Sequence, residues 1–150
     1  MELYSLVHLA NPHWQYRNKM IAQMMRPNSS VLDLGCGAKN LLKFYKPSKY
    51  LGVDGVVSAD LILDLNSDFQ LPTGWDYAVN SGILEFVVRP DLYLEKIKGV
   101  SQEYFFSWWR GSGYGRLPFD DIERLISKNY KIIETTEMGL INRLYRCVNI

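Results

Sequence analysis

The chain has 150 residues, 47% of them hydrophobic and 22% charged, and a formal net charge of +1 at pH 7. This length predicts a single domain, with residues 1–28 as an N-terminal helical segment and residues 29–150 as the core. The near-neutral charge gives no electrostatic argument for nucleic acid or an anionic membrane as a partner. The two cysteines are far apart, and residues 1–10 lack the pattern of a signal peptide. We therefore expect a cytoplasmic protein without a disulfide or a metal site.

The first predicted element is a helix over residues 13–26. Its apolar and aromatic residues recur at spacings of three and four, and Arg17 lies within the same stripe. Pro12 suits the first turn of a helix, and Pro27 should end it. A stripe of this kind belongs to a core or an interface more often than to a binding site.

A glycine turn follows the next predicted strand. Residues 31–37 read Val-Leu-Asp-Leu-Gly-Cys-Gly, which predicts a buried strand over residues 31–35 that ends where a ligand can touch the backbone. A short helix over residues 39–45 is expected next. The following strand, residues 50–54, ends in Asp54. An acid at the tip of this strand is well placed to bind a ribose diol.

Apolar runs and turn residues define the rest of the chain. Only residues 55–59 separate Asp54 from the apolar run 61–63, whereas a parallel crossover usually needs about ten or more residues. Either the helix of this crossover is missing, or residues 61–63 form a short edge segment. Beyond them we predict strands over residues 76–80, 104–109, 130–136 and 140–148, helices over 90–98 and 117–128, and a glycine-rich loop over 110–115. The short link 137–139 predicts an antiparallel hairpin at the C-terminal end.

Two classes of cofactor bind at glycine turns of this layout. A dinucleotide site has the pattern G-x-G-x-x-G, but the third glycine position here is Asn40. The carboxylate of Asp33 would also lie near two phosphate charges. S-adenosylmethionine has no phosphate and carries an ammonium group, so the same carboxylate would attract it. The charge argument favours S-adenosylmethionine over a nicotinamide dinucleotide, and a glycine turn used only for tight packing is the third reading.

Four segments in order resemble the motifs of class I S-adenosylmethionine-dependent methyltransferases. Residues 33–37 resemble the first motif, and Asp54 matches the ribose-binding acid of that family. Residues 59–66 look like the segment whose acid, here Asp64, approaches the adenine amino group. Residues 75–86 look like the fourth motif, a strand and loop that line the cofactor. The phrasing is most similar to compact bacterial methyltransferase-like proteins, including the MetW type.

The resemblance implies an α/β protein with a minimal Rossmann-like class I methyltransferase fold, a mostly parallel central sheet with a C-terminal antiparallel hairpin. It implies S-adenosylmethionine as the cofactor. Asp33 and the glycine-turn backbone would hold its methionine end, and residues 80–82 would face the sulfonium. The implied cofactor-binding residues are Asp33, Gly35, Cys36, Gly37, Asp54, Gly55, Asp64, Leu65, Asn80, Ser81 and Gly82.

No catalytic residue is predicted. A sulfonium methyl group is already activated, so the protein has chiefly to align the acceptor and exclude water. Many relatives carry a Leu-Glu-His tripeptide, whereas here Glu85 is followed by Phe86, which removes one plausible base. Lys39 stands where many relatives have a third glycine, and it is either solvent-exposed or directed at the methionine carboxylate.

The acceptor and the partners leave alternatives open. The chain carries no large insertion, which predicts a small-molecule acceptor or one presented by a partner protein. A non-catalytic methyltransferase-fold subunit that binds a partner protein is the second hypothesis. Relatives often cover the cofactor with an N-terminal helix, which makes Trp14 and Tyr16 secondary candidates. Residues 108–115 either stack a planar acceptor or supply core tryptophans and a flexible turn.

Overall fold

The structure is a computed structural model that describes residues 12–110 and 117–150. The predicted loop over residues 110–115 therefore lies outside the described residues, apart from Arg110. In chain order the elements are α2 (Pro12–Met24), β1 (Ser30–Leu34), the 3-10 helix η1 (Asn40–Lys43), β2 (Lys49–Asp54), β3 (Leu61–Ile62), β4 (Trp75–Asn80), the 3-10 helix η2 (Leu84–Phe86), α3 (Pro90–Lys96), β5 (Ser101–Trp109), α4 (Phe119–Ser127), β6 (Tyr130–Glu137) and β7 (Asn142–Asn149).

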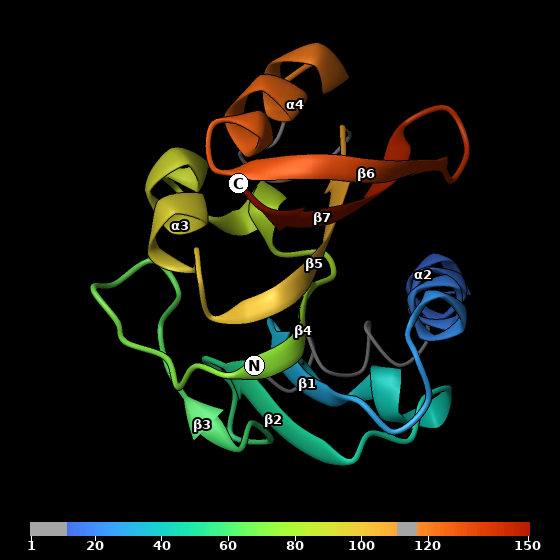
Figure 1. The fold of residues 1–150 in the computed structure, drawn as a ribbon, viewed down its shortest axis with the longest axis vertical. Coiled ribbons are helices and arrows are strands. Elements are labelled where there is room, and N and C mark those ends of the chain that lie inside the picture. The colour runs from blue at the N-terminus through green and yellow to red at the C-terminus, as the bar shows by residue number, and fades with distance from the viewer. Residues whose placement is uncertain (1–11, 111–116) are drawn as a thin grey trace.

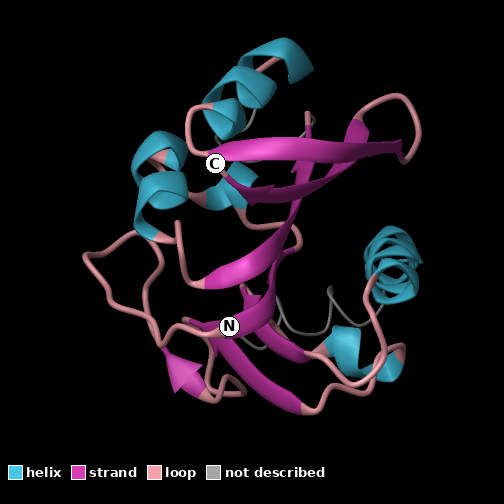
Figure 2. Cartoon of the chain, viewed as in Figure 1, coloured by secondary structure: helices cyan, strands magenta, loops and turns pink. Residues whose placement is uncertain are grey.

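One seven-stranded sheet forms the centre of the molecule, in the order β3-β2-β1-β4-β5-β7-β6 (Figure 1, Figure 2). Strands β1 to β5 pair in parallel. Strand β7 is antiparallel to both of its neighbours, β5 and β6. The predicted α/β class, the mostly parallel sheet and the C-terminal antiparallel hairpin are confirmed. None of the helices in the described ranges is long and apolar enough to cross a membrane.

The strands bury side chains on both faces of the sheet, as the long apolar runs predict. Val31, Val79 and Phe105 face α2, where Ile21 completes one core cluster. The alternate residues of the same strands pack against α3 and α4 on the other face (Figure 1). Each fully buried side chain of this kind contributes about 1.5–3 kcal/mol. The members of the second cluster include Leu32, Ala78, Tyr104, Phe106, Leu94, Ile122 and Ile126, all 0% exposed.

The connection from β2 to β3 is shorter than that of an ordinary parallel crossover. It contains no helix, and β3 has two residues, which pair with Val53 and Asp54. The two alternatives predicted for this region therefore both apply, because the crossover helix is missing and the apolar run forms a short edge strand. Asp60 holds the tight return, since its Oδ2 accepts from Gly52 N at 2.9 Å and its own N–H donates to Gly52 O at 2.9 Å. Local hydrogen bonds here replace the packing of a crossover helix.

The helix expected over residues 39–45 is reduced to the four residues of η1. Lys39, just before it, has a left-handed backbone with φ 59° and ψ 40°. That conformation costs a non-glycine residue free energy and cannot begin an α-helix. The turn that follows β1 is therefore tighter than predicted.

Candidate functional site

The carboxyl ends of β1, β2 and β4 meet at one edge of the sheet, and the glycine turn after β1 lies there. Gly35 and Gly37 have positive φ values, 73° and 51°, which glycine adopts without a steric penalty. The N–H groups of Gly35 and Cys36 both donate to Val53 O, at 2.8 and 3.1 Å. The turn is thus fixed to the neighbouring strand rather than left to move independently.

Asp54 lies at the end of β2 and reaches across to the glycine turn. Its Oδ2 accepts from Gly37 N at 2.8 Å, and its Oδ1 accepts from Gly55 N at 2.7 Å. Three of the predicted cofactor-binding residues are therefore in direct contact. Each oxygen of a carboxylate has two lone pairs, so both retain capacity to accept from a ligand hydroxyl.

Asp33 is 5% exposed and lies in β1, two residues before Gly35 of the turn. The Tyr50 hydroxyl donates to its Oδ2 at 2.7 Å. Burial raises the pKa of Asp33 from 3.8 to about 7, the Tyr50 hydrogen bond lowers it, and the charge of Asp54 raises it further. A carboxylate this costly to ionise gains from any cation placed beside it.

Cys36 is buried in the same turn, and its thiol packs against β2. A Cβ atom built on Gly52 would lie 2.9 Å from the Cys36 Sγ. Only glycine at position 52 therefore lets the turn approach the strand this closely. Burial raises the pKa of Cys36, so the thiol stays protonated and serves packing.

Lys39 is paired within the site region rather than free in solvent. Its Nζ lies 2.6 Å from Asp60 Oδ1, and this pairing lowers the pKa of Asp60. The lysine thus braces the shortened β2–β3 return. Neither of the two predicted environments of Lys39 describes this ion pair.

The predicted adenine segment begins next to the predicted ribose acid, because Leu63 N donates to Asp54 O at 2.9 Å. Asp64 is exposed, and its Oδ1 accepts from Asn66 N at 2.9 Å. Leu65 is buried, 8% exposed. The segment therefore presents one apolar and one acidic side chain next to Asp54.

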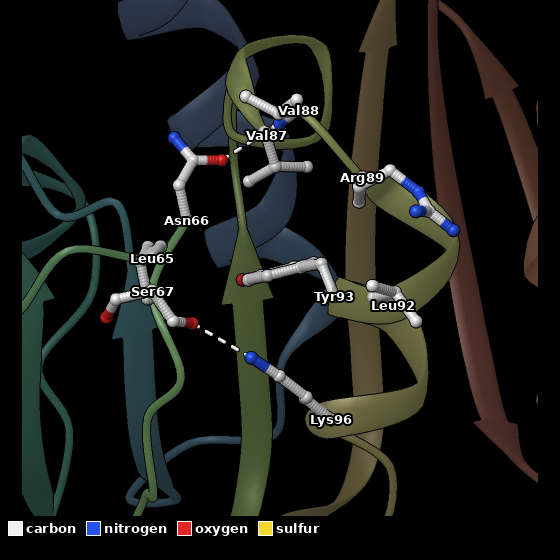
Figure 3. A pocket seen from close by; sticks show the side chains of 9 residues that line it. All are labelled: Leu65, Asn66, Ser67, Val87, Val88, Arg89, Leu92, Tyr93 and Lys96. Carbon is white, nitrogen blue, oxygen red and sulfur yellow. Dashed lines mark hydrogen bonds between the residues drawn. The ribbon is translucent and has the colours of Figure 1, made fainter.

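Leu65 also lines a hollow of about 300 Å³ between this segment and α3 (Figure 3). Lys96 donates to Ser67 O at 2.9 Å, and Asn66 Oδ1 accepts from Val88 N at 2.8 Å (Figure 3). These bonds join the segment to α3 and to the loop that precedes α3. The hollow is thus a gap between the predicted adenine segment and the helix layer.

Residues 80–82 divide between the two faces of the sheet. Asn80 is fully buried, and its Oδ1 accepts from the Tyr93 hydroxyl of α3 at 2.5 Å. Gly82 N donates to Ser107 Oγ at 2.7 Å, and Ser81 Oγ accepts from Arg17 Nε at 2.5 Å. Ser81 therefore points toward α2, while the Asn80 side chain points toward α3.

Arg17 is a site residue that the sequence reasoning did not select. It is 4% exposed and lines a cleft together with Trp14, Asp33, Gly35 and Ser81. The available signal is its position, because an arginine in the apolar stripe of a helix points inward. The cleft joins α2 to the predicted methionine-binding turn, as the resemblance implies for an N-terminal helix. Tyr16, by contrast, is 57% exposed.

Glu85 in η2 is the second buried charge near Arg17. It is 1% exposed, and its Oε2 has no hydrogen-bond partner among the described residues. Burial raises the pKa of Glu85 from 4.5 to about 7, and the charge of Arg17 acts in the opposite direction. The cleft therefore lies within a cluster of one cation and two acids that are partly neutral at pH 7.

Replacing Gly82 with alanine tests the contact between α2 and residues 80–82. A Cβ at Gly82 would lie 2.6 Å from Arg17 Nη2, at a backbone φ of 71°. We expect the free energy of unfolding to fall by about 2 kcal/mol, with roughly 1 kcal/mol from the backbone alone. Gly74→Ala is the matched control, since Gly74 has φ 90° and nothing within 4 Å. Equal losses in urea denaturation of the two variants would show that Arg17 does not press on Gly82.

The strand order, the reversed β7 and the glycine turn with an acid on the next strand define a Rossmann-like class I methyltransferase fold. Within this class the chain belongs to the MetW family, because the family model described as methionine biosynthesis protein MetW matches residues 16–110. No curated protein sequence matches the chain. Among the described side chains, no group of three or more histidine, cysteine, aspartate and glutamate residues could hold a metal ion.

Several solved structures share the fold over most of the chain. An S-adenosylmethionine-dependent methyltransferase from Aquifex aeolicus is 13% identical with a TM-score of 0.73, covering 95% of this chain and 95% of that chain. The 1,6-didemethyltoxoflavin-N1-methyltransferase of Burkholderia thailandensis, solved with S-adenosylhomocysteine, is 14% identical with a TM-score of 0.71, covering 91% and 78%. A protein described as a methyltransferase, in complex with the Trm112 methyltransferase activator of Haloferax volcanii, is 11% identical with a TM-score of 0.67, covering 91% and 89%.

Proposed function

We propose that this protein is a cytoplasmic S-adenosylmethionine-dependent methyltransferase that acts on a small acceptor. One observation carries the proposal. A narrow cleft of about 20 Å³ beside the glycine turn is lined by a buried acid, Asp33, and a buried cation, Arg17. The amino-acid end of S-adenosylmethionine carries one ammonium and one carboxylate group. The two side chains complement both charges, and each is buried deeply enough for the pairing to be strong.

The other predicted cofactor-binding residues fit the same ligand. The free lone pairs of Asp54 suit the two ribose hydroxyls, and the Gly35–Gly37 backbone lets the methionine end approach closely. Leu65 offers an apolar contact for the adenine ring, and Asp64 an acceptor for its amino group. Ser81 and Gly82, held by Arg17 and Ser107, border the sulfonium end. When bound, the cofactor would supply an activated methyl group.

The same charges disfavour a dinucleotide. Asp33 lies at the turn where a pyrophosphate would have to bind, and its carboxylate would repel the phosphate charges. The lysine nearest to this turn, Lys39, is already paired with Asp60. Position 40, where a dinucleotide turn has its third glycine, is a buried asparagine. A nicotinamide-linked oxidoreductase is therefore a poorer fit to this site.

The protein's own contribution to methyl transfer is alignment and exclusion of water. Trp14 and Arg17 place α2 over the cleft, so a ligand in it would be shielded from solvent on that side. Orientation of two reactants can contribute several kcal/mol, up to about 7–11 in favourable model reactions. A general base is needed only for an acceptor that carries a proton on its nucleophilic atom.

Calorimetric titration of the purified chain with S-adenosylhomocysteine, S-adenosylmethionine and NAD⁺ tests the proposal. We expect micromolar affinity for the first two ligands and no heat of binding with NAD⁺. The absence of S-adenosylhomocysteine binding at millimolar concentration would overturn the enzyme reading for the isolated chain. Binding of NAD⁺ in its place would support the oxidoreductase reading.

A further inference from the structure

A second hollow lies next to the candidate cofactor cleft. It has a volume of about 250 Å³ and is lined by residues of α2, the end of β5 and the turn that joins β6 to β7. Arg110 N donates to Ile141 O at 2.9 Å, which fixes the turn to the end of β5. The side chains that form the hollow include Trp14, Arg17, Trp109, Met138, Leu140 and Ile141.

This hollow and the candidate cofactor cleft share a wall. Trp14 and Arg17 line this second hollow and also the cleft that contains Asp33, Gly35 and Ser81. A molecule in the second hollow would therefore be separated from the methionine end of a bound cofactor by only these two side chains. Methyl transfer requires the nucleophilic atom of the acceptor to face the methyl group of the cofactor, in line with its bond to sulfur.

The chemistry of the walls selects a class of ligand. Two indole rings, Trp14 and Trp109, border the hollow, and aromatic rings of this kind stack on planar molecules. Met138, Leu140 and Ile141 add apolar surface. Among the described residues that line it, Arg17 carries the only charge. The volume is slightly below the range of about 300–1,000 Å³ that is typical of small-molecule sites, which suits one or two rings.

We infer that this hollow is the acceptor pocket and that it takes a planar aromatic anion of one or two rings. The inference rests on the proposed function, because the acceptor needs a cofactor beside it. The guanidinium of Arg17 and the sulfonium together carry more positive charge than the cofactor carboxylate that Arg17 is proposed to hold, and the remaining positive charge favours an anionic acceptor over an amine. Of the two adjacent tryptophans, Trp108 belongs to the hydrophobic core. It is 1% exposed and donates from Nε1 to Leu117 O at 3.0 Å. Trp109 is the member that borders the pocket.

Three probes of similar size test this assignment by calorimetry, each with and without saturating S-adenosylhomocysteine. Indole-3-acetate is aromatic and anionic, tryptamine has the same ring with a cation, and decanoate is anionic without a ring. We expect indole-3-acetate to bind at least about tenfold more tightly than the other two. We expect Ile141→Glu to weaken the binding of indole-3-acetate by about tenfold or more relative to the wild type. Ile133→Glu is the matched control, since the two isoleucines lie in the same hairpin and are 48% and 45% exposed.

The outcomes separate the two levels of the proposal. Equal affinity for the three probes, or equal effects of Ile141→Glu and Ile133→Glu, would overturn the acceptor pocket. The titration with S-adenosylhomocysteine alone judges the cofactor site, and neither glutamate variant should change that affinity more than about twofold. Indole-3-acetate binding that depends on Ile141, in a chain that fails to bind S-adenosylhomocysteine, would show an anion pocket without methyl transfer. It would thereby overturn the pocket's role as the acceptor site.

Discussion

Replacing Asp54 with alanine is expected to weaken S-adenosylhomocysteine binding by about 100-fold or more. A hydrogen bond to a charged group contributes about 1.5–3 kcal/mol, and a tenfold change in affinity corresponds to about 1.4 kcal/mol. The variant loses the carboxylate that is proposed to bind two ribose hydroxyls. It also loses the bonds to Gly37 N and Gly55 N that hold the glycine turn. Calorimetry on the wild type and the variant measures the loss.

Asp68→Ala is the control for the Asp54 variant. Its side chain is 100% exposed and pairs with Lys96, and neither residue is assigned to the cofactor, so its removal changes the net charge equally. We expect its affinity for S-adenosylhomocysteine to stay within about twofold of the wild type. Thermal unfolding of both variants checks that they remain folded. An Asp54→Ala protein that is folded and binds within about threefold of the wild type would contradict the assignment of the ribose site.

The second large effect is a loss of stability with rising pH that originates in Asp33 and Glu85. Burial raises the pKa of both groups to about 7 in the folded protein, from 3.8 and 4.5. The unfolded chain therefore releases these protons first, and the folded protein is stabilised by them at low pH. The contribution is complete below about pH 4 and is lost as the pH rises through about 7. Shifts of this size correspond to on the order of 4 kcal/mol for Asp33 and about 3 kcal/mol for Glu85.

Asp33→Asn and Glu85→Gln remove the two titrations one at a time. We expect each variant to gain stability relative to the wild type as the pH rises from about 5 to about 8, because neither has to ionise a buried acid. Urea denaturation at several pH values gives the free energy of unfolding of each protein. Asp68→Asn is the control, since it makes the same substitution at a side chain that is 100% exposed. Parallel curves for the wild type and both variants would show that neither acid is costly to ionise.

The strands and the glycine turn were predictable because their signals are local. A run of apolar residues that ends in Gly-Cys-Gly predicts a buried strand followed by a tight turn. The hairpin over β6 and β7 likewise follows from two β-prone runs and a short link. The fold class follows from the order of these elements, since parallel strands joined by helices form one sheet.

Other features depend on contacts between distant segments, which one sequence does not display. Asp60 holds the β2–β3 return through Gly52 and Lys39, so a crossover helix is unnecessary there. Arg17 is inward-facing because Ser81, 64 residues away, accepts its hydrogen bond at 2.5 Å. The different environments of Trp108 and Trp109 follow from the alternation of side chains along β5, which places two adjacent side chains on opposite faces of the sheet.

The roles of the cofactor-binding residues stay predictions, although their placement agrees with the spacing argument. The sequence located Asp33, Gly35, Gly37 and Asp54 at one edge because acids and glycines at strand ends of a parallel sheet have to meet. It did not indicate that the Asn80 side chain would bond to Tyr93 of α3. A strand residue can face either side, and only the packing of the helices decides which.

A crystal structure of the protein with S-adenosylhomocysteine is the most direct test of the central claim. We predict ribose hydroxyls within hydrogen-bond distance of the Asp54 carboxylate, and the methionine ammonium and carboxylate groups beside Asp33 and Arg17. The hollow that contains Trp109 and Ile141 should then open toward the sulfur atom. Density for the ligand at another part of the sheet, or with its ribose away from Asp54, would contradict the account.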